Sequence, residues 1–222
     1  MRLVVRTFSE LCITVGALIV LFVVYVLCWT GVQAASASAG QIDTLQREWT
    51  ATPVRPAAPA PEAVPYAAGK GIAVMYVPRL GRDWKWPVLQ GTGVGTLKKG
   101  LGHYADSARL GATGNFAVAG HRRTYGDPFK DFPRLREGDA IVLTDGTTWF
   151  TYRVDRAPYR TVPTDVAVID PVPAKSGFDG PGRYLTLTTC EPEWGSSHRL
   201  VVWAHLDATR PVADGRPQAL DS

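Results

Sequence analysis

The chain has 222 residues, of which 45% are hydrophobic, and its 24 Lys and Arg against 20 Asp and Glu give a net charge of +4. It contains no basic run and no segment in which basic and aromatic residues interleave at helical spacing. This pattern argues against nucleic acid as a partner. The positive charge is too small to identify any other partner by itself.

The N-terminal region contains an uninterrupted apolar segment, Leu11 to Trp29, which has the ~20 residues that a helix needs to cross a bilayer. Arg2 and Arg6 precede this segment, and the next basic residue is Arg47. The asymmetry predicts a single-pass cell-membrane protein with its N-terminus in the cytoplasm and the rest of the chain outside. A cleaved signal peptide is the alternative, because Val32-Gln33-Ala34 resembles a cleavage site, but the apolar core of a signal peptide is usually only ~7–15 residues long.

The composition changes after this segment. Ala34–Gly40 is rich in Ala and Ser and Ala51–Ala68 in Ala and Pro, which favours an extended spacer, with a short helix expected over Gln41–Trp49 between them. About 140 residues follow, enough for one domain with its own core. The expected parts are a cytoplasmic N-terminus (1–10), a transmembrane anchor (11–30), a linker (31–68), a β-domain (69–207) and a flexible C-terminal tail (208–222).

Short segments rich in β-branched and aromatic residues, separated by Gly, Pro and Asp, predict strands in the domain. The expected strands are Gly71–Val77, Pro87–Gln90, Gly114–His121, Ala140–Thr144, Thr148–Asp155, Arg183–Cys190 and Arg199–Asp207. Asp145-Gly146 predicts a hairpin turn, and Leu97–Gly102 and Thr164–Ile169 predict single helical turns. Because no long helical period follows the apolar segment, we expect an all-β fold, a closed barrel of about eight strands, rather than a sandwich or a βαβ fold.

Cys190 is the only cysteine outside the apolar segment, which holds Cys12 and Cys28. Compartments outside the cytoplasm oxidise spare thiols, so a lone thiol there is buried and inert, bridged to another molecule, or functional. In the strand before Cys190, Leu185 and Leu187 alternate with threonines. The leucine face fits a core, and the threonine face, which ends in the thiol, fits the wall of a groove.

Potential partners of the thiol are four histidines and an arginine. His121 stands where an apolar strand ends, as Cys190 does, and Arg199 follows the thiol by nine residues. His198 is adjacent to this arginine, and His205 is expected to be a core or rim residue. The remaining histidine is His103. Since no paired Cys or His spacing occurs, the sequence predicts no metal site.

The chain resembles the sortases, the cysteine transpeptidases of Gram-positive cell surfaces. The resemblance is carried by Thr186-Leu-Thr-Thr-Cys190, by Arg199 and by the upstream Gly120-His121-Arg122. Gly102-His103-Tyr104 and the stretch from Gly114 to Phe129 are most similar to the class E sortases of high-GC actinobacteria. The resemblance covers most of the expected domain and implies a sortase-type β-barrel.

The resemblance implies three catalytic residues: Cys190 as nucleophile, His121 as acid and base, and Arg199 as the group that stabilises the oxyanion. Their chemistry fits these roles. A thiol of pKa ~8.5 becomes a better nucleophile beside a cation, and a histidine that titrates near neutrality can give and take a proton. Arginine stays charged and can hold developing negative charge.

Three further residues are expected to bind substrate. The backbone N–H of Glu191 follows the nucleophile and is a plausible second donor to the oxyanion. Thr189 either orients the substrate backbone or is an ordinary strand residue that faces inward. By resemblance, Tyr104 contacts the sorting signal, which in class E enzymes is Leu-Ala-x-Thr-Gly; rim packing is its alternative role.

The implied reaction cleaves the Thr–Gly bond of a C-terminal sorting signal on a surface protein, holds the protein as a thioester, and transfers it to the amine of a peptidoglycan precursor, lipid II. The alternative is a sortase-fold module that binds surface proteins with little turnover. An L,D-transpeptidase needs an element such as Ser-x-Gly-Cys, which Thr-Thr-Cys-Glu-Pro does not supply. No cofactor is expected, and calcium activation stays open although the acids are scattered: Asp106, Glu137, Asp139 and Asp165.

Overall fold

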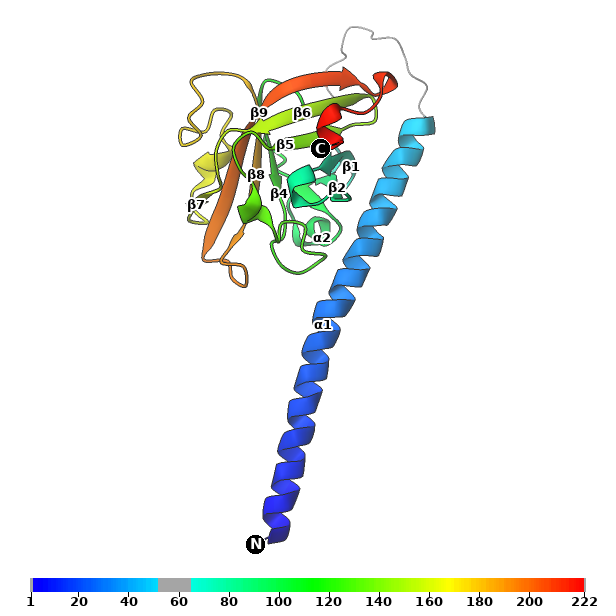
Figure 1. The fold of residues 1–222 in the computed structure, drawn as a ribbon, viewed down its shortest axis with the longest axis vertical. Coiled ribbons are helices and arrows are strands. Elements are labelled where there is room, and N and C mark those ends of the chain that lie inside the picture. Colours follow the sequence, from blue (N-terminus) through cyan, green and yellow to red (C-terminus); the bar gives the residue numbers. More distant parts are fainter. Residues whose placement is uncertain (1, 52–64, 222) are drawn as a thin grey trace.

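The computed structural model describes residues 2–51 and 65–221 and consists of one long helix beside a β-barrel (Figure 1). Helix α1 runs without interruption from Arg2 to Ala51. Its stretch Val4–Tyr25 is long and apolar enough to cross a membrane and is not buried against the barrel. This stretch begins a few residues before the anchor that the sequence predicts.

The nine strands among the described residues are β1 (Gly71–Tyr76), β2 (Lys85–Gln90), β3 (Leu101–His103), β4 (Gly114–Ala119), β5 (Ala140–Thr144), β6 (Thr148–Val154), β7 (Tyr159–Thr161), β8 (Arg183–Glu191) and β9 (His198–Pro211). Besides α1, the helical elements are α2 (Val94–Leu97) and the 3-10 turns η1 (Pro78–Leu80), η2 (Phe132–Arg134), η3 (Val166–Ile169), η4 (Val212–Asp214) and η5 (Gln218–Leu220). All of the described helical elements after α1 have four residues or fewer. This agrees with the absence of a long helical period in the sequence after the apolar segment.

The sheet closes on itself. Its strand order is β6-β5-β1-β2-β3-β4-β8-β9, and β6 also pairs with β9, so that eight strands form a barrel. The ninth strand, β7, pairs with the N-terminal part of β9 outside the ring. β2 and β3 are parallel, as are β4 and β8, and the other pairs are antiparallel. The predicted closed barrel of about eight strands is confirmed.

The barrel interior holds the main hydrophobic core. On β8, Leu185 and Leu187 belong to it, as the alternation predicts. The opposite face of the neighbouring β9 carries Val201 and Trp203, which pack on Val168 of η3 in a smaller cluster. The core therefore fixes β8 and β9 from both faces just before they reach the end of the barrel where Cys190 lies.

The C-terminal third of α1 packs on the outside of the barrel. Ala34, Ser38, Ile42 and Leu45 are buried, and their spacing of three and four residues forms one stripe along the helix. Ile42 and Leu45 contact Val74 of β1. The helix expected over Gln41–Trp49 is present as the last part of α1. The expectation that the linker does not pack is wrong for residues 31–51, because alanine is the strongest helix former and small side chains permit a close approach to the barrel. The Pro-rich part of the predicted linker, 52–64, lies outside the described residues.

Two further expectations are wrong. The stretch Leu97–Gly102 is not one helical turn, since α2 ends at Leu97 and β3 begins at Leu101. Residues 208–221 are not a flexible tail, because β9 continues to Pro211 along β6 and Pro217 is buried. In both places the partner strand supplies backbone hydrogen bonds that local sequence does not reveal.

Candidate active site

The order of three neighbouring strands brings the predicted catalytic residues together. β8 lies between β4 and β9, and Cys190 near the end of β8 is directly opposite Arg199 on β9. On the other side, Ala119 of β4 pairs with Thr188, so the parallel register continues to bring His121 level with Cys190. Adjacent strands are ~4.8 Å apart, so the half-buried Cys190 has His121 on one neighbouring strand segment and Arg199 on the other.

His121 is the second residue after β4 and is half-buried. Burial lowers the pKa of His121; Asp127 opposes this effect, and Lys98 adds to it. The Nε2 atom of His121 is buried and has no hydrogen-bond partner among the described residues. The ring packs on Tyr125 with 5.1 Å between ring centroids. A mainly neutral imidazole whose Nε2 is unoccupied is suited to exchange a proton with a reacting group.

Arg199 is held at the rim by its own loop. Its Nη1 donates hydrogen bonds of 2.9 Å to the carbonyl oxygens of Ser196 and His198. One guanidinium nitrogen is thus used to fix the side chain. The guanidinium has further N–H groups, which makes it able to bind a substrate oxygen while it keeps these two bonds.

Thr189 lies on the core side of β8, between two residues of the opposite face. It is 3% exposed, and its hydroxyl donates a 2.9 Å hydrogen bond to the carbonyl oxygen of Gly120. The residue before the thiol is thereby bonded to the residue before His121. Of the two roles considered for Thr189, this contact supports the inward-facing strand residue.

Tyr104 follows β3 and lies against β8. Its hydroxyl is 3.0 Å from the Oγ1 atom of Thr188, which is two residues before Cys190 and on the same face. Thr186 and Thr188 on this face are buried rather than open to solvent. The predicted groove wall is therefore covered along most of its length and opens only near the thiol.

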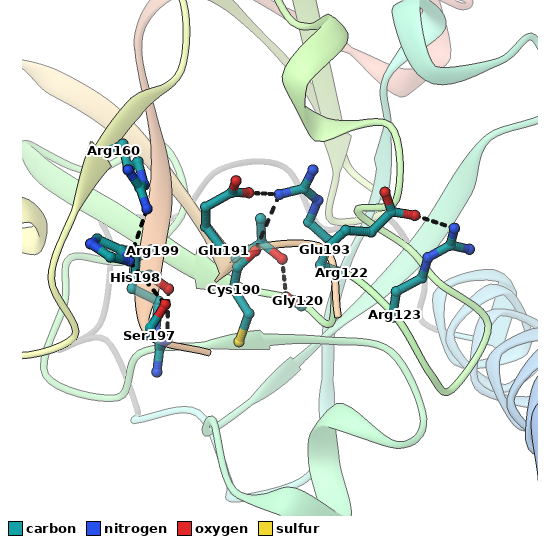
Figure 2. Close-up of polar contacts among 11 residues, drawn as sticks. Gly120, Arg122, Arg123, Arg160, Cys190, Glu191, Glu193, Ser197, His198 and Arg199 are labelled. Atoms are coloured by element: carbon teal, nitrogen blue, oxygen red, sulfur yellow. Dashed lines mark hydrogen bonds and ion pairs between the residues drawn. The ribbon is translucent and has the colours of Figure 1, made fainter. Parts of the chain in front are cut away.

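Two ion pairs join the loop after His121 to the loop after Cys190 (Figure 2). Arg122 pairs with Glu191, and Arg123 pairs with Glu193. Arg122 also lies 3.5 Å from the carbonyl oxygen of Cys190. Figure 2 shows the sulfur of Cys190 pointing away from both pairs. We call these four residues the loop clamp.

The loop clamp was not predicted from the sequence. The predicted role of Glu191 was through its backbone N–H, whereas its side chain pairs with Arg122. A signal was present, since two arginines follow the histidine and two glutamates follow the cysteine. Opposite charges beside two residues that are expected to meet indicate a pair across the site.

The other histidines have partners away from the thiol. His103 is buried, its Nδ1 lies 2.7 Å from Oε1 of Gln90, and burial lowers its pKa. His198 contacts Arg160, with 3.1 Å between Nδ1 and Nη2. His205, which was expected in the core or rim, is exposed and contacts Asp155.

Within residues 2–51 and 65–221, no group of three or more His, Cys, Asp or Glu side chains is arranged to hold a metal ion.

A cavity of about 790 Å³ lies between the end of α1 and the barrel. Trp49, Tyr76 and Trp149 line it, and none of the candidate catalytic residues does. The geometry at Cys190, and not the size of a cavity, therefore identifies the candidate site.

Comparison with known proteins agrees with this geometry. Residues 75–207 match the Sortase domain family. The chain is 39% identical over 224 residues to sortase SrtE1 of Streptomyces coelicolor; the match covers 98% of the chain and 61% of the relative, so the chain spans about three fifths of that protein's length.

Two solved structures are also similar. Sortase E from Streptomyces avermitilis is 72% identical with a TM-score of 0.67, covering 70% of this chain and 99% of that one. Sortase E1 from Streptomyces coelicolor with a tripeptide in the active site is 40% identical with a TM-score of 0.65 and the same coverage.

Proposed function

The chain belongs to the sortase family of cysteine transpeptidases, and on this premise we propose that it cleaves the Thr–Gly bond of a C-terminal sorting signal and transfers the surface protein to a peptidoglycan-precursor amine. The observation that carries the proposal is the strand order β4-β8-β9, which sets Cys190 between His121 and Arg199. A binding module would not need a thiol, a proton carrier and a fixed cation side by side.

The proposed reaction has two acyl transfers. His121 takes the proton of the Cys190 thiol, and the resulting thiolate attacks the threonine carbonyl carbon. The C–N bond to glycine then breaks while His121 gives that proton to the departing amine. The result is a thioester. The acceptor amine then attacks the thioester carbonyl, His121 removes its proton, and the C–S bond breaks to release the thiolate.

Negative charge develops on the carbonyl oxygen in each transfer. Arg199 is proposed to hold it, since its guanidinium stays charged and lies on the strand next to the thiol. The backbone N–H of Glu191 is the proposed second donor. The loop clamp supports this assignment, because pairing with Arg122 holds the backbone of Glu191 in place.

The sorting signal is proposed to enter beside Tyr104 and to have a Leu-Ala-x-Thr-Gly or Leu-Pro-x-Thr-Gly pattern. The proximity of Tyr104 to Thr188 on the strand that carries the thiol supports this placement. The tripeptide reported in the active site of the Streptomyces coelicolor enzyme supports a peptide substrate. Thr189 is the weaker candidate for substrate contact, since its hydroxyl already donates to Gly120.

Helix α1 is proposed to anchor the enzyme in the cell membrane through Val4–Tyr25, with the N-terminus in the cytoplasm and the barrel outside. Sortases act at the cell surface, which agrees with this placement. We also propose that catalysis needs no metal cofactor, so that a chelator leaves turnover unchanged.

One assay tests the proposal. The full-length chain in detergent is mixed with a quenched Leu-Ala-x-Thr-Gly peptide and an amine acceptor, and cleavage, acyl-enzyme mass and transpeptidation product are measured. Cys190→Ala should remove turnover by about 10³-fold or more, and Arg199→Ala should lower it by about 10²–10³-fold. Both variants should keep the thermal unfolding midpoint of the parent.

The alternative, a sortase-fold module that binds surface proteins with little turnover, makes the opposite prediction. The wild-type chain would then bind the peptide with no cleavage and no mass shift on Cys190. Loss of turnover with a chelator, restored by calcium, would contradict the proposal that no metal is needed.

A further inference from the structure

Helix α1 connects the candidate membrane span to the barrel without a break. It is helical from Arg2 to Ala51, so the part that fits a membrane and the part that contacts the barrel belong to one helix. At ~1.5 Å per residue, the nine residues from Tyr25 to Ala34 place Ala34, the first side chain after the span that is described as buried, about 13 Å beyond the span. The helix thus fixes both the height and the orientation of the barrel.

The contacts along α1 define which end of the barrel faces the membrane. Ala34, the buried side chain nearest to the span among those described, lies against Gly126 in the loop that follows His121. A Cβ atom built on Gly126 would lie 3.5 Å from the Cβ of Ala34. The last contact is Trp49, which lies against Gly146 in the turn between β5 and β6.

The end of the barrel that carries the thiol therefore points toward the membrane span. Figure 1 shows this arrangement, with the start of β9 and the loop before it on the side of the barrel nearer to the N-terminal part of α1. His121 belongs to the same end, since its ring packs on Tyr125, the neighbour of Gly126. The site is not on the side of the barrel that faces away from the membrane.

The side chains on this end suit a lipid surface. Trp194, in the loop after Cys190, is 66% exposed and stacks on Arg123, with 4.6 Å from the guanidinium carbon to the ring centroid. Lys98 is also exposed and lies over Tyr125. Exposed indole rings and lysines are enriched where proteins meet headgroups, especially anionic ones.

We infer that the active-site end of the barrel faces and contacts the lipid headgroups, and that the length of α1 sets the height of the barrel above the membrane. The headgroup layer extends ~5–8 Å beyond the hydrocarbon, so loops projecting from a barrel held about 13 Å away can reach it. This inference rests on the proposed function and narrows its substrates. A sorting signal and an acceptor that are both held in the membrane would then reach the thiol only while α1 keeps its length.

The test changes the length of α1 between the candidate membrane span and the barrel. Seven helix-forming residues are inserted between Val32 and Gln33, which are both exposed. Two helical turns raise the barrel by ~10 Å and restore nearly the same helix face. The matched control inserts seven Gly and Ser residues at the same point. This flexible insertion lengthens the connection but does not hold the barrel at a fixed height above the membrane.

Each protein is reconstituted in vesicles of three parts phosphatidylcholine to one part phosphatidylglycerol. Two substrates are compared: a soluble sorting-signal peptide and the same signal followed by a membrane-spanning segment. The helical insertion should lower turnover of the anchored substrate at least tenfold and leave the soluble peptide within twofold. The Gly-Ser control should keep most of its activity on both. Equal turnover of the anchored substrate by wild type and the helical insertion would overturn the inference.

A second measurement does not depend on activity. Phosphatidylcholine with a nitroxide on its headgroup should quench the part of the fluorescence that Trp194→Phe removes, and the helical insertion should abolish this quenching. Unquenched Trp194 in the wild-type protein would overturn the inference. If no protein turned over either substrate, the proposed function would fail, and the quenching would still decide how the barrel faces the membrane.

Discussion

Arg122 and Glu191 pair across the active site, although they are 69 residues apart in the chain. Each directly follows a proposed catalytic residue, Arg122 after His121 and Glu191 after Cys190. The Arg122 side chain is 8% exposed and that of Glu191 is 23% exposed, so little solvent screens the pair. A contact of this kind fixes the two loops relative to each other and with them the separation of imidazole and thiol.

Replacing Glu191 by Gln should therefore damage both stability and catalysis. Arg122 would keep its charge in a buried place without a partner, which should cost about 1–3 kcal/mol, between the small value of exposed pairs and the larger cost of breaking fully buried ones. We expect kcat to fall about tenfold while KM changes less than twofold. Thermal unfolding and steady-state kinetics measure the two effects.

The double variant Arg122→Met with Glu191→Gln separates stability from positioning. It removes the unpaired charge, so its unfolding midpoint should recover most of the loss seen in the single variant. If the pair positions the catalytic residues, kcat should stay low. Recovery of kcat together with stability would show that the pair only supports the fold.

Thr189→Val tests the hydrogen bond that joins the two catalytic strands. Valine has nearly the same shape as threonine, but the carbonyl oxygen of Gly120 would lose its donor, at a cost of about 1–3 kcal/mol. We expect a three- to tenfold decrease in kcat with KM unchanged. A rise in KM with kcat unchanged would instead show that Thr189 binds the substrate backbone.

Strands in which apolar and polar residues alternate over five or more positions could be predicted from the sequence, because burial of one face of a sheet makes every second residue apolar. β3 and β7 have three residues each and are held by their partner strands, so local pattern did not reveal them. The continuation of α1 through residues 31–40 and its packing on the barrel were missed for a related reason. Its stripe from Ala34 to Leu45 is a helix face only because the barrel covers it.

The candidate catalytic residues could be proposed from the sequence because Thr186–Cys190, Gly120–Arg122 and Arg199 resemble the motifs of sortases. Their proximity could not be derived from local patterns, since it depends on the parallel pairing of β4 with β8, which are more than 60 residues apart. The loop clamp follows from the same pairing. Its charges are evident in the sequence, but their pairing depends on the strand order.

Tyr104→Phe tests recognition of the sorting signal. The variant loses a hydroxyl that lies 3.0 Å from Oγ1 of Thr188. If the hydroxyl contacts the signal, the ratio of kcat/KM for peptides with Ala and Pro at the second position should change at least threefold. Thr188→Val is the matched control, because it breaks the same hydrogen bond and keeps the tyrosine. Equal changes in both variants would assign the effect to the bond within the protein.

The charges around His121 predict that removing Lys98 and removing Asp127 shift the pKa of His121 in opposite directions. Burial lowers the pKa of His121, the positive charge of Lys98 lowers it further, and the negative charge of Asp127 raises it. Lys98→Met should therefore move the His121 titration to higher pH, and Asp127→Asn should move it to lower pH. Asparagine suits the second position, because residue 127 has φ 53°.

Two measurements check these directions: NMR titration of the His121 ring and the pH dependence of kcat/KM, which reports groups in the free enzyme. The titration of His103 is the internal control, since its pKa is lowered by burial and by Arg109, neither of which these variants change. Shifts of His121 in the same direction in both variants would contradict the electrostatic account.

The same lowered pKa makes stability depend on pH. Between the folded pKa of His121 and the ordinary value near 6.5, the unfolded chain binds more protons than the folded one, so stability should fall as pH falls below ~6.5. His121→Gln should remove the part of this loss that His121 contributes, and His103 should account for a further part. Urea unfolding of wild type and variant at pH 5 and pH 7.5 measures the difference. An equal loss of stability in both proteins would show that His121 is not desolvated in the folded state.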